Sequence, residues 1–398
     1  MLQVFHNANF KFMWASKWYF LALSGVALLA AFGIIIIKGF NYGIDFAGGT
    51  AVQVRFSQPP RLDALRVVLE GAGLGDVTLQ SIGEAADNEV LIRVERTGMS
   101  EGAGGEGGDV SQKVLGALRG MQDGEAGVRD RLDLNTVSEP ALREFLAGHL
   151  PASPDLAPPD AGTADPGLAA ESIIRARNDR NGLFTDIGQV AGIPGVTGPV
   201  AAILRERATL GGFSLRGIDF VGPTAGKELM RNTGWAILGS VLGILVYVWF
   251  RFHRIAWGLA SIIALVHDVT IAAGAMALTG KEFSLPIVAA LLTILGYSIN
   301  DTIVLFDRIR ENLRLYRDVD FEKVVNASVN QTLSRTILTS FTVFVAVFAL
   351  FLYGGDKLNP MSFCLLVGLV SGTYSTIYIA AALLVVTHQV LGPRYAKA

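Results

Sequence analysis

The sequence predicts an α-helical membrane protein, a bundle of six transmembrane helices with an α+β domain outside the membrane. Hydrophobic residues make up 51% of the 398 residues and charged residues only 17%, whereas soluble domains carry about 25% charged residues. The apolar residues concentrate in six stretches that can each cross about 30 Å of hydrocarbon. Between the first two stretches, the pattern is that of the strands and helices of a globular domain.

Composition and motifs also exclude several classes of function. The net charge is −2, with 33 basic and 35 acidic residues, so the chain as a whole lacks the basic footprint of a nucleic-acid-binding protein. The single cysteine, Cys364, cannot form an intrachain disulfide. The sequence contains no phosphate-binding loop, no serine nucleophile elbow and no metal-ligand spacing. We therefore expect no enzymatic activity, no cofactor and no metal, and an external or electrochemical energy source.

The six predicted spans are 18–37, 232–250, 255–278, 285–306, 336–353 and 361–387. The first has no clear cleavage site and is interpreted as an uncleaved signal anchor. Lys and Arg cluster at alternate span ends, and such clusters stay in the cytoplasm. Both termini are therefore predicted to be cytoplasmic. The predicted divisions are an N-terminus with the first helix, an outer domain, and five helices with the C-terminus, at 1–38, 39–230 and 231–398.

The outer domain has a regular order of elements. Alternating apolar residues predict strands, and helical spacing of apolar residues predicts two helices between them. In chain order the elements are a strand at 51–56, a helix at 62–73, strands at 76–83 and 89–96, a helix at 110–120 and a strand at 211–222. This order is that of a ferredoxin-like fold.

An insertion at about 121–208 interrupts this pattern. Its middle, 151–166, is rich in Pro, Ala, Gly and Asp and is predicted to be an exposed linker. Helices are expected in 132–148 and 172–207, and the second stretch contains GIPGV, which is similar to helix-hairpin-helix modules whose backbone amides hold a phosphate. Three interpretations stay open: a helical spacer, a protein-contact surface and a DNA-binding module. The insertion is expected to be dispensable for the core fold.

A four-residue string occurs at both roots of the outer domain, as Gly43-Ile44-Asp45-Phe46 and Gly217-Ile218-Asp219-Phe220. An aspartate at such a root can cap backbone amides or fix the angle of the domain. Coincidence is the alternative. The residues selected as root motifs are Gly43, Asp45, Phe46, Gly48, Gly49, Asp219, Gly222 and Pro223.

Four ionisable residues fall within or at the edge of spans, where each costs at least about 2.5–3.5 kcal/mol and is a functional candidate. His267 and Asp268 lie in the middle of the third span, Asp301 in the inner third of the fourth, and Arg335 at the start of the fifth. Facing helix stripes would let Arg335 neutralise Asp301, and protonation would remove that pairing, which gives a proton-dependent switch. A static salt bridge, and for His267 a simple interhelical hydrogen bond, stay open as alternatives.

Two further features concern helix surfaces. The pairs Gly239 with Gly243 and Gly368 with Gly372 have the four-residue spacing that lets transmembrane helices approach closely. The segment 306–325 is predicted to be an amphipathic helix on the anionic inner leaflet, with a docking surface for a partner as the alternative. Its selected polar residues are Asp307, Arg308, Arg310, Glu311 and Asn312.

Several strings together resemble the SecD/SecF family of bacterial protein export, part of the resistance-nodulation-division superfamily. They are GIDFAGGT (43–50), VGPTAGKEL (221–229), HD (267–268), GYSINDTIVLFDRIREN (296–312) and TLSRT (332–336). The resemblance covers the six spans and the ferredoxin-like core, whereas the insertion departs from it. It implicates Asp301 and Arg335 in proton coupling.

The resemblance implies an accessory subunit of the Sec translocase that uses the proton motive force to complete polypeptide export. The implied partners are a SecD-like subunit, the SecYEG channel, YajC, the unfolded polypeptide and membrane lipids, with no nucleic acid expected. The implied location is the bacterial inner membrane, with a periplasmic domain. Two alternatives stay open: a small-molecule or lipid exporter of the same superfamily, and a DNA-binding receptor that uses the helix-hairpin-helix-like insertion.

The topology yields a first test. Because Lys and Arg cluster at one set of span ends, a reporter fused at Ser153 should be active as an exported protein and a reporter fused at the C-terminus as a cytoplasmic one. Paired alkaline phosphatase and green fluorescent protein fusions measure this. Cytoplasmic activity of the Ser153 fusion would overturn the topology.

Overall fold

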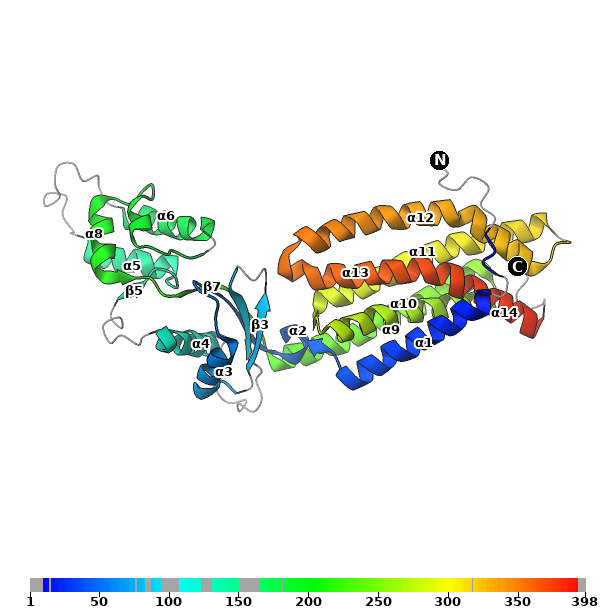
Figure 1. Ribbon diagram of the computed structural model, residues 1–398, viewed down its shortest axis with the longest axis horizontal. Helices are drawn as coiled ribbons and strands as arrows, with labels where there is room; N and C mark the ends of the chain where they lie inside the picture. The colour runs from blue at the N-terminus through cyan, green and yellow to red at the C-terminus, as the bar shows by residue number, and fades with distance from the viewer. Residues whose placement is uncertain are drawn as a thin grey trace. The chain divides into compact units, whose positions relative to one another are not determined.

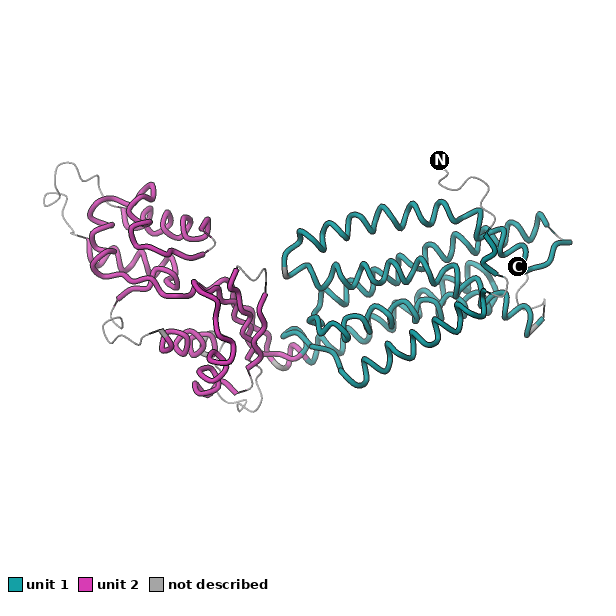
Figure 2. The backbone as a smooth tube through the Cα atoms, viewed as in Figure 1, with its two compact units in different colours: residues 1–46, 227–398 teal, residues 47–226 magenta. Residues whose placement is uncertain are grey.

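The computed structural model describes residues 10–13, 16–75, 77–82, 87–94, 107–122, 131–150, 165–180, 182–316 and 318–392. The chain forms two compact units (Figure 2). Unit 1, residues 1–46 and 227–398, is a helical bundle, and unit 2, residues 47–226, contains the sheet and the shorter helices.

Six helices in the described part of the chain are long and apolar enough to cross a membrane, which confirms the six predicted spans. A π-helical turn, η2 (Thr376–Ala380), and α14 (Ala381–Leu391) extend the sixth span. The helices are α1 (Ser16–Lys38), α9 (Pro223–Phe252), α10 (Ile255–Thr279), α11 (Leu285–Leu315), α12 (Phe321–Tyr353) and α13 (Gly355–Ser375) (Figure 1).

Contacts between helix ends order the bundle. Lys17 at the start of α1 forms an ion pair of 2.7 Å with Glu322 at the start of α12, and Gln389 near the end of α14 donates to the same carboxylate at 3.0 Å. At the opposite end, β1 (Asn41–Tyr42) pairs in parallel with β8 (Glu282–Phe283). Helix ends that the sequence assigns to the positively charged side therefore meet at one end of unit 1, as the predicted topology requires.

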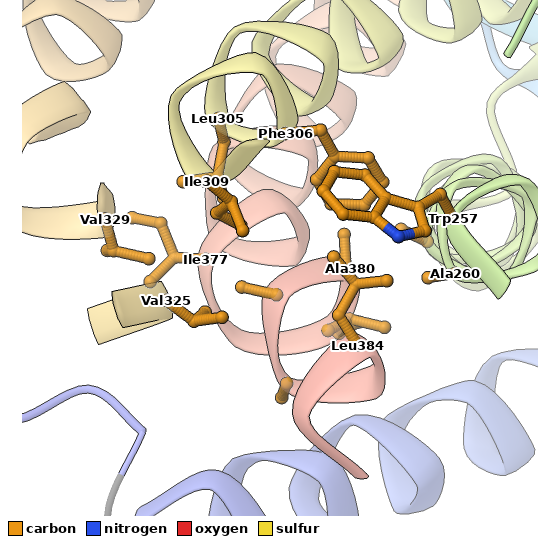
Figure 3. Close-up of a cluster of buried hydrophobic side chains, with 14 of the residues drawn as sticks. Trp257, Ala260, Leu305, Phe306, Ile309, Val325, Val329, Ile377, Ala380 and Leu384 are labelled. Atoms are coloured by element: carbon orange, nitrogen blue, oxygen red, sulfur yellow. The ribbon is translucent and has the colours of Figure 1, made fainter. Parts of the chain in front are cut away.

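Three helices form the centre of the bundle. In the apolar stretch that would cross the membrane, 50% of the residues of α10, 56% of those of α11 and 67% of those of the sixth span, which includes α13, are buried. The corresponding share is only 6–11% in α1, α9 and α12. A cluster of large apolar side chains fills the space between α10, α11, α12 and the end of the sixth span (Figure 3). In it, Trp257 packs edge to face on Phe306, with the ring centroids 5.1 Å apart.

The predicted amphipathic helix at 306–325 is wrong as a separate element. Helix α11 continues without a break to Leu315, and α12 begins at Phe321. Phe306 and Ile309 are fully buried and point into the cluster of Figure 3. These apolar residues continue the buried stripe of α11, so they pack on neighbouring helices.

Unit 2 contains a four-stranded antiparallel sheet with the strand order β3-β4-β2-β7. Alternate strand residues such as Val52, Val54 and Ile92 are buried together with Leu69 and Leu118 from two helices. Burial on alternate positions is typical of a sheet that packs helices on one face. In chain order the elements are β2 (Gly49–Phe56), α3 (Leu62–Gly71), β3 (Val77–Ile82), β4 (Glu89–Val94), α4 (Gly107–Gln122) and β7 (Phe213–Val221), the sequence of strands and helices that was predicted.

The insertion has a hydrophobic core of its own, which includes Leu142, Ile173, Phe184 and Leu204. The helix expected from residue 132 begins at Glu139, because the first residues form β5. The second stretch is broken into three helices, and GIPGV lies between α7 and α8. The elements are β5 (Leu132–Asp133), α5 (Glu139–His149), α6 (Pro166–Asp179), α7 (Gly188–Ala191), α8 (Gly198–Arg207) and β6 (Ala208–Thr209). Most of the predicted linker, 151–164, lies outside the described residues.

Two polar side chains close the insertion at its base. Asp133 Oδ1 accepts from the amide of Gly211 at 2.7 Å, next to the parallel pairing of β5 with β6. The buried Asn135 accepts from the amide of Phe184 at 2.8 Å and donates to the carbonyls of Phe184 and Gly211 at 3.1 and 2.7 Å. Arg177 donates to the carbonyls of Leu134 and Val137 beside them. Burial lowers the pKa of Arg177, and the negative charge of Asp133 acts in the opposite direction. Both ends of the insertion are thus held together.

A substitution at Asn135 tests this clamp. Asn135→Ala leaves buried backbone groups of Phe184 and Gly211 unsatisfied, and each such group costs about 1–3 kcal/mol. Hydrogen exchange of the full chain should speed up by about tenfold or more in 134–150 and 183–207, with little change in the sheet. Asn178→Ala, on the exposed side of α6, is the matched control. Unchanged exchange in the insertion would show that the clamp contributes nothing.

Candidate functional site

Helix α10 places a fully buried carboxylate, Asp268, at the centre of the bundle. Its Oδ2 accepts from the hydroxyls of Ser298 on α11 and Ser375 on α13, both at 2.7 Å. Its Oδ1 accepts from Ser371 on α13 at 2.7 Å and lies 3.1 Å from Nδ1 of His267. These neighbours fill the hydrogen-bonding capacity of a carboxylate, which has about four lone-pair sites. Asp268 therefore joins the three central helices at one point.

Asp301, one turn further along α11 than Ser298, is buried but has much weaker contacts. Its Oδ2 lies 3.5 Å from the hydroxyl of Ser340 on α12, at the outer limit of a hydrogen bond. Ser340 in turn accepts from Thr373 on α13 at 2.9 Å. Asp268 thus contacts α13 directly, whereas Asp301 is connected to α13 only through Ser340, and only Asp268 is held by several donors.

The predicted pairing of Asp301 with Arg335 is not observed. Among the described residues Asp301 makes no ion pair, and the side chain of Arg335 is exposed. Helix α12 instead turns Ser340 toward Asp301. Positions 335 and 340 differ by about 140° around a helix of 3.6 residues per turn, so Arg335 lies on another side of α12 than Ser340, although its charge still acts on Asp301. The stripe of Arg335, Thr339 and Thr342 lies on the exposed side of α12.

The sixth span supplies most of the polar partners, and sequence reasoning missed them. Within 371–376, Ser371 and Ser375 bind Asp268, Thr373 binds Ser340, and the hydroxyl of Tyr374 lies 2.8 Å from that of Ser24 on α1. A signal was present in the sequence: SGTYST places five hydroxyl side chains in one apolar span, with two serines four residues apart on one helix face.

The π-helical turn η2 begins in this polar segment, at Thr376. The hydroxyl of Thr376 donates to the carbonyl of Gly372 at 3.0 Å and lies 3.2 Å from that of Thr302 on α11. Such turns are rare and occur frequently at functional sites. The sixth span therefore changes its helical geometry directly after Ser375, which binds Asp268.

The glycine predictions divide into two outcomes. A Cβ on Gly372 would lie 3.2 Å from the side chain of Ser298, and one on Gly368 would clash with Ile294. These two glycines therefore allow α13 to approach α11 closely, as predicted. Gly239 and Gly243 have open space around them, so contacts within this chain do not use these two glycines, and their packing role stays a prediction.

Most of the selected polar residues at the end of α11 contact neighbouring helices, whereas Glu311 pairs within α11. Asp307 forms an ion pair of 2.7 Å with Arg251 of α9, and Arg308 pairs with Glu311 at 2.6 Å. The buried Asn312 donates to Ser328 and Gln331 of α12 at 2.8 and 2.7 Å. These residues connect α9, α11 and α12, and Arg310 lines a cleft beside them.

The two root motifs have different structures. In α2 (Ile44–Ala47), Asp45 accepts from the amide of Leu285 at 2.8 Å and so caps the first turn of α11, in line with the capping role suggested for it. Phe46 is buried, and Gly43 lies against Glu282 of β8. Asp219 is exposed in strand β7, so the repeated string does not repeat its conformation.

Two of the other root glycines have a backbone reason to be glycine. Gly48 and Gly49 have φ angles of 72° and 122°, which side chains with a Cβ adopt only at a cost. Gly222 has open space around it, and helix α9 begins at Pro223.

Removing hydroxyl donors tests the Asp268 cluster. Ser371→Ala combined with Ser375→Ala leaves the buried carboxylate without two donors, and each hydrogen bond to a charged group is worth about 1.5–3 kcal/mol. The midpoint of thermal unfolding in detergent should fall by several degrees. Thr387→Ala is the control, because that hydroxyl donates to the carbonyl of Leu383 within its own helix. Equal midpoints for the double variant and the control would contradict the clamp.

Comparison with known proteins agrees with this architecture. The family model of "Protein export membrane protein SecD/SecF, C-terminal" matches residues 202–390, and that of "SecD/SecF GG Motif" matches residues 33–60. The protein translocase subunit SecF of Koribacter versatilis is 37% identical over 402 residues, which cover 99% of this chain and 95% of that protein. The SecF of Desulfurispirillum indicum is 33% identical, over 92% of this chain and 88% of its own length.

A solved structure matches as well. The crystal structure of SecDF, a translocon-associated membrane protein from Thermus thermophilus, has a TM-score of 0.64 and 30% identity and covers 96% of this chain. This chain spans only 39% of the length of that SecDF chain. Six helices in the described residues are long and apolar enough to span a membrane. Together with the matching family models and with relatives 33–37% identical along nearly the whole chain, this shows that the chain belongs to the SecD/SecF family of protein-export membrane proteins, among the SecF translocase subunits.

Proposed function

We propose that this chain is an accessory subunit of the Sec translocase that works with a SecD-like partner and uses the proton motive force to complete polypeptide export. The observation that carries the proposal is the pair of buried carboxylates, Asp268 and Asp301, in one layer of polar side chains. Ionisable residues inside a membrane bundle commonly form proton pathways. Family membership supplies the process that such a pathway would drive.

The unequal contacts of the two carboxylates assign them different roles. Asp268 is surrounded by three hydroxyls and an imidazole, so it acts as a fixed anchor. Asp301 has one long contact, to Ser340, and it can therefore gain or lose a proton with little disruption of other hydrogen bonds. A protonated carboxyl becomes a donor. A protonated Asp301 that donated to Ser340 would rearrange the hydrogen bonds that join Asp301, Ser340 and Thr373, and α12 would move relative to α13. This movement is the proposed link between proton passage and mechanical work.

The exposed polar side of the bundle supports a partner in the membrane. Arg335, Thr339 and Thr342 on α12 are exposed, as is Asn300 on α11. A guanidinium facing lipid is costly, and a second set of helices would cover it. The SecDF chain that matches this one is more than twice as long, which supports a SecD-like subunit in that place. We propose that Arg335 acts in proton coupling at this interface, and that the assembly works with the SecYEG channel and YajC.

The sheet of unit 2 supports the proposed work on the polypeptide. Its topology agrees with a ferredoxin-like domain, which we place in the periplasm of a bacterial inner-membrane protein. Strands β2 and β7 pair, with Gly49 at the start of one opposite Val221 at the end of the other. Entry and exit of the chain are thus adjacent, so a helix movement transmitted to them would swing the domain as one body and pull on an emerging polypeptide.

Asp301→Asn tests the proton role. Asn is nearly isosteric and still hydrogen-bonds, but it cannot alternate between charged and neutral states. If Asp301 carries a proton, gradient-dependent export of a secreted substrate into inverted membrane vesicles should be lost, although the SecD-like partner still co-purifies. Asp318→Asn, in the exposed turn between α11 and α12, is the charge-matched control. Export at the wild-type level with the Asp301 variant would refute the proposed role.

A further inference from the structure

An open cleft of about 510 Å³ lies where α9 ends beside the last turns of α11. It is at the end of the bundle that gathers most Lys and Arg residues, outside the carboxylate cluster. One lining residue comes from α9 and the rest from α11: Arg251, Asp307, Arg310, Glu311, Arg314 and Leu315. Three arginines against two carboxylates make its lining positive.

Pairing within the chain leaves part of this positive charge available. Asp307 is engaged by Arg251 at 2.7 Å, and Glu311 by Arg308 at 2.6 Å. Arg310 and Arg314 have no carboxylate partner in the described part of the chain. They are four residues apart and so lie on one face of α11. Arg310 is half-buried and Arg314 is exposed, and Arg310 also donates to the carbonyl of Arg251 at 3.5 Å.

The surface beside the cleft is apolar and membrane-facing. Tyr247, one turn before Arg251, is 50% exposed, and Phe250 is 70% exposed. Leu315, which lines the cleft itself, is 65% exposed. Helix α9 has only 6% of its span window buried, so this side of the bundle meets lipid. The cleft therefore joins a cationic pocket to a surface suited to acyl chains.

We propose that this cleft binds the phosphate headgroup of an anionic phospholipid, with Arg310 and Arg314 as the phosphate ligands. Guanidinium groups bind phosphate oxygens in a planar, bidentate way, and basic pockets between membrane helices suit such headgroups. The acyl chains would lie along Tyr247 and Phe250 of α9. This site requires neither proton coupling nor a partner subunit.

The test uses the full chain in neutral-detergent micelles and a phosphatidylglycerol with a dansylated acyl chain, followed by energy transfer from the protein's tryptophans. The double variant Arg310→Gln with Arg314→Gln should bind about tenfold or more weakly, because each basic residue near a headgroup strengthens the interaction. The double variant Arg310→Lys with Arg314→Lys should be intermediate, since it keeps the charge and loses the fork. Arg231→Gln with Lys323→Gln, two exposed positions outside the cleft, should bind as the wild type does.

Competition separates the possible ligands. Unlabelled phosphatidylglycerol should displace the probe, whereas phosphatidylcholine and inorganic phosphate should not do so at comparable concentrations. Wild-type affinity of the Arg310/Arg314 glutamine variant would overturn the site. If the Arg231/Lys323 control bound equally weakly, the effect would be general charge attraction. Displacement by phosphate alone would show that the cleft is a free-anion site. Equal displacement by phosphatidylcholine would show that the cleft does not recognise the headgroup. Each of these results overturns the proposal.

Discussion

The central constraint on this molecule is the cost of burying the Asp268 carboxylate in an apolar bundle. An uncompensated charge in such surroundings is prohibitively unfavourable, so the chain must bring donors to it from elsewhere. Two helices supply them, α11 through Ser298 and α13 through Ser371 and Ser375. Satisfying one carboxylate thereby fixes the mutual arrangement of the three helices that form the bundle centre, and the close approach at Gly372 is part of the same requirement.

The second buried carboxylate, Asp301, has fewer hydrogen bonds than Asp268, and our proposed function depends on this difference. Among the contacts of helix α12 with the centre is Ser340, which connects Asp301 to Thr373 by one long and one ordinary hydrogen bond. A single proton can alter that contact, whereas the Asp268 anchor would have to lose several bonds at once. The contact at Asp301 is therefore weaker than the cluster around Asp268, although α12 is held elsewhere by Glu322, Ser328 and Gln331.

Unit 2 contains both the sheet and the insertion, and polar contacts join the two ends of the insertion. Asp133 and Asn135 join the two ends of the insertion through backbone groups, and its apolar residues form a separate core. The sheet core draws on other residues, from β2 to α4 and from β7. The ends of the insertion are thus closed by local polar contacts, and its apolar core is separate from that of the sheet.

Features that depend on local pattern could be predicted before the fold was known. The thickness of the hydrocarbon layer sets the minimum length of each span, and the alternation of apolar residues marks the four strands. The aspartate of the first GIDF string was suggested as a cap, and Asp45 caps the first turn of α11. Tertiary structure alone decided the rest. The role of Ser371 cannot be predicted from its neighbours in the span, because its hydroxyl binds a carboxylate about 100 residues away in the chain. The outward direction of Arg335, the continuation of α11 to Leu315 and the lack of neighbours at Gly239 depend on the rotation and placement of whole helices, which neighbouring residues do not encode.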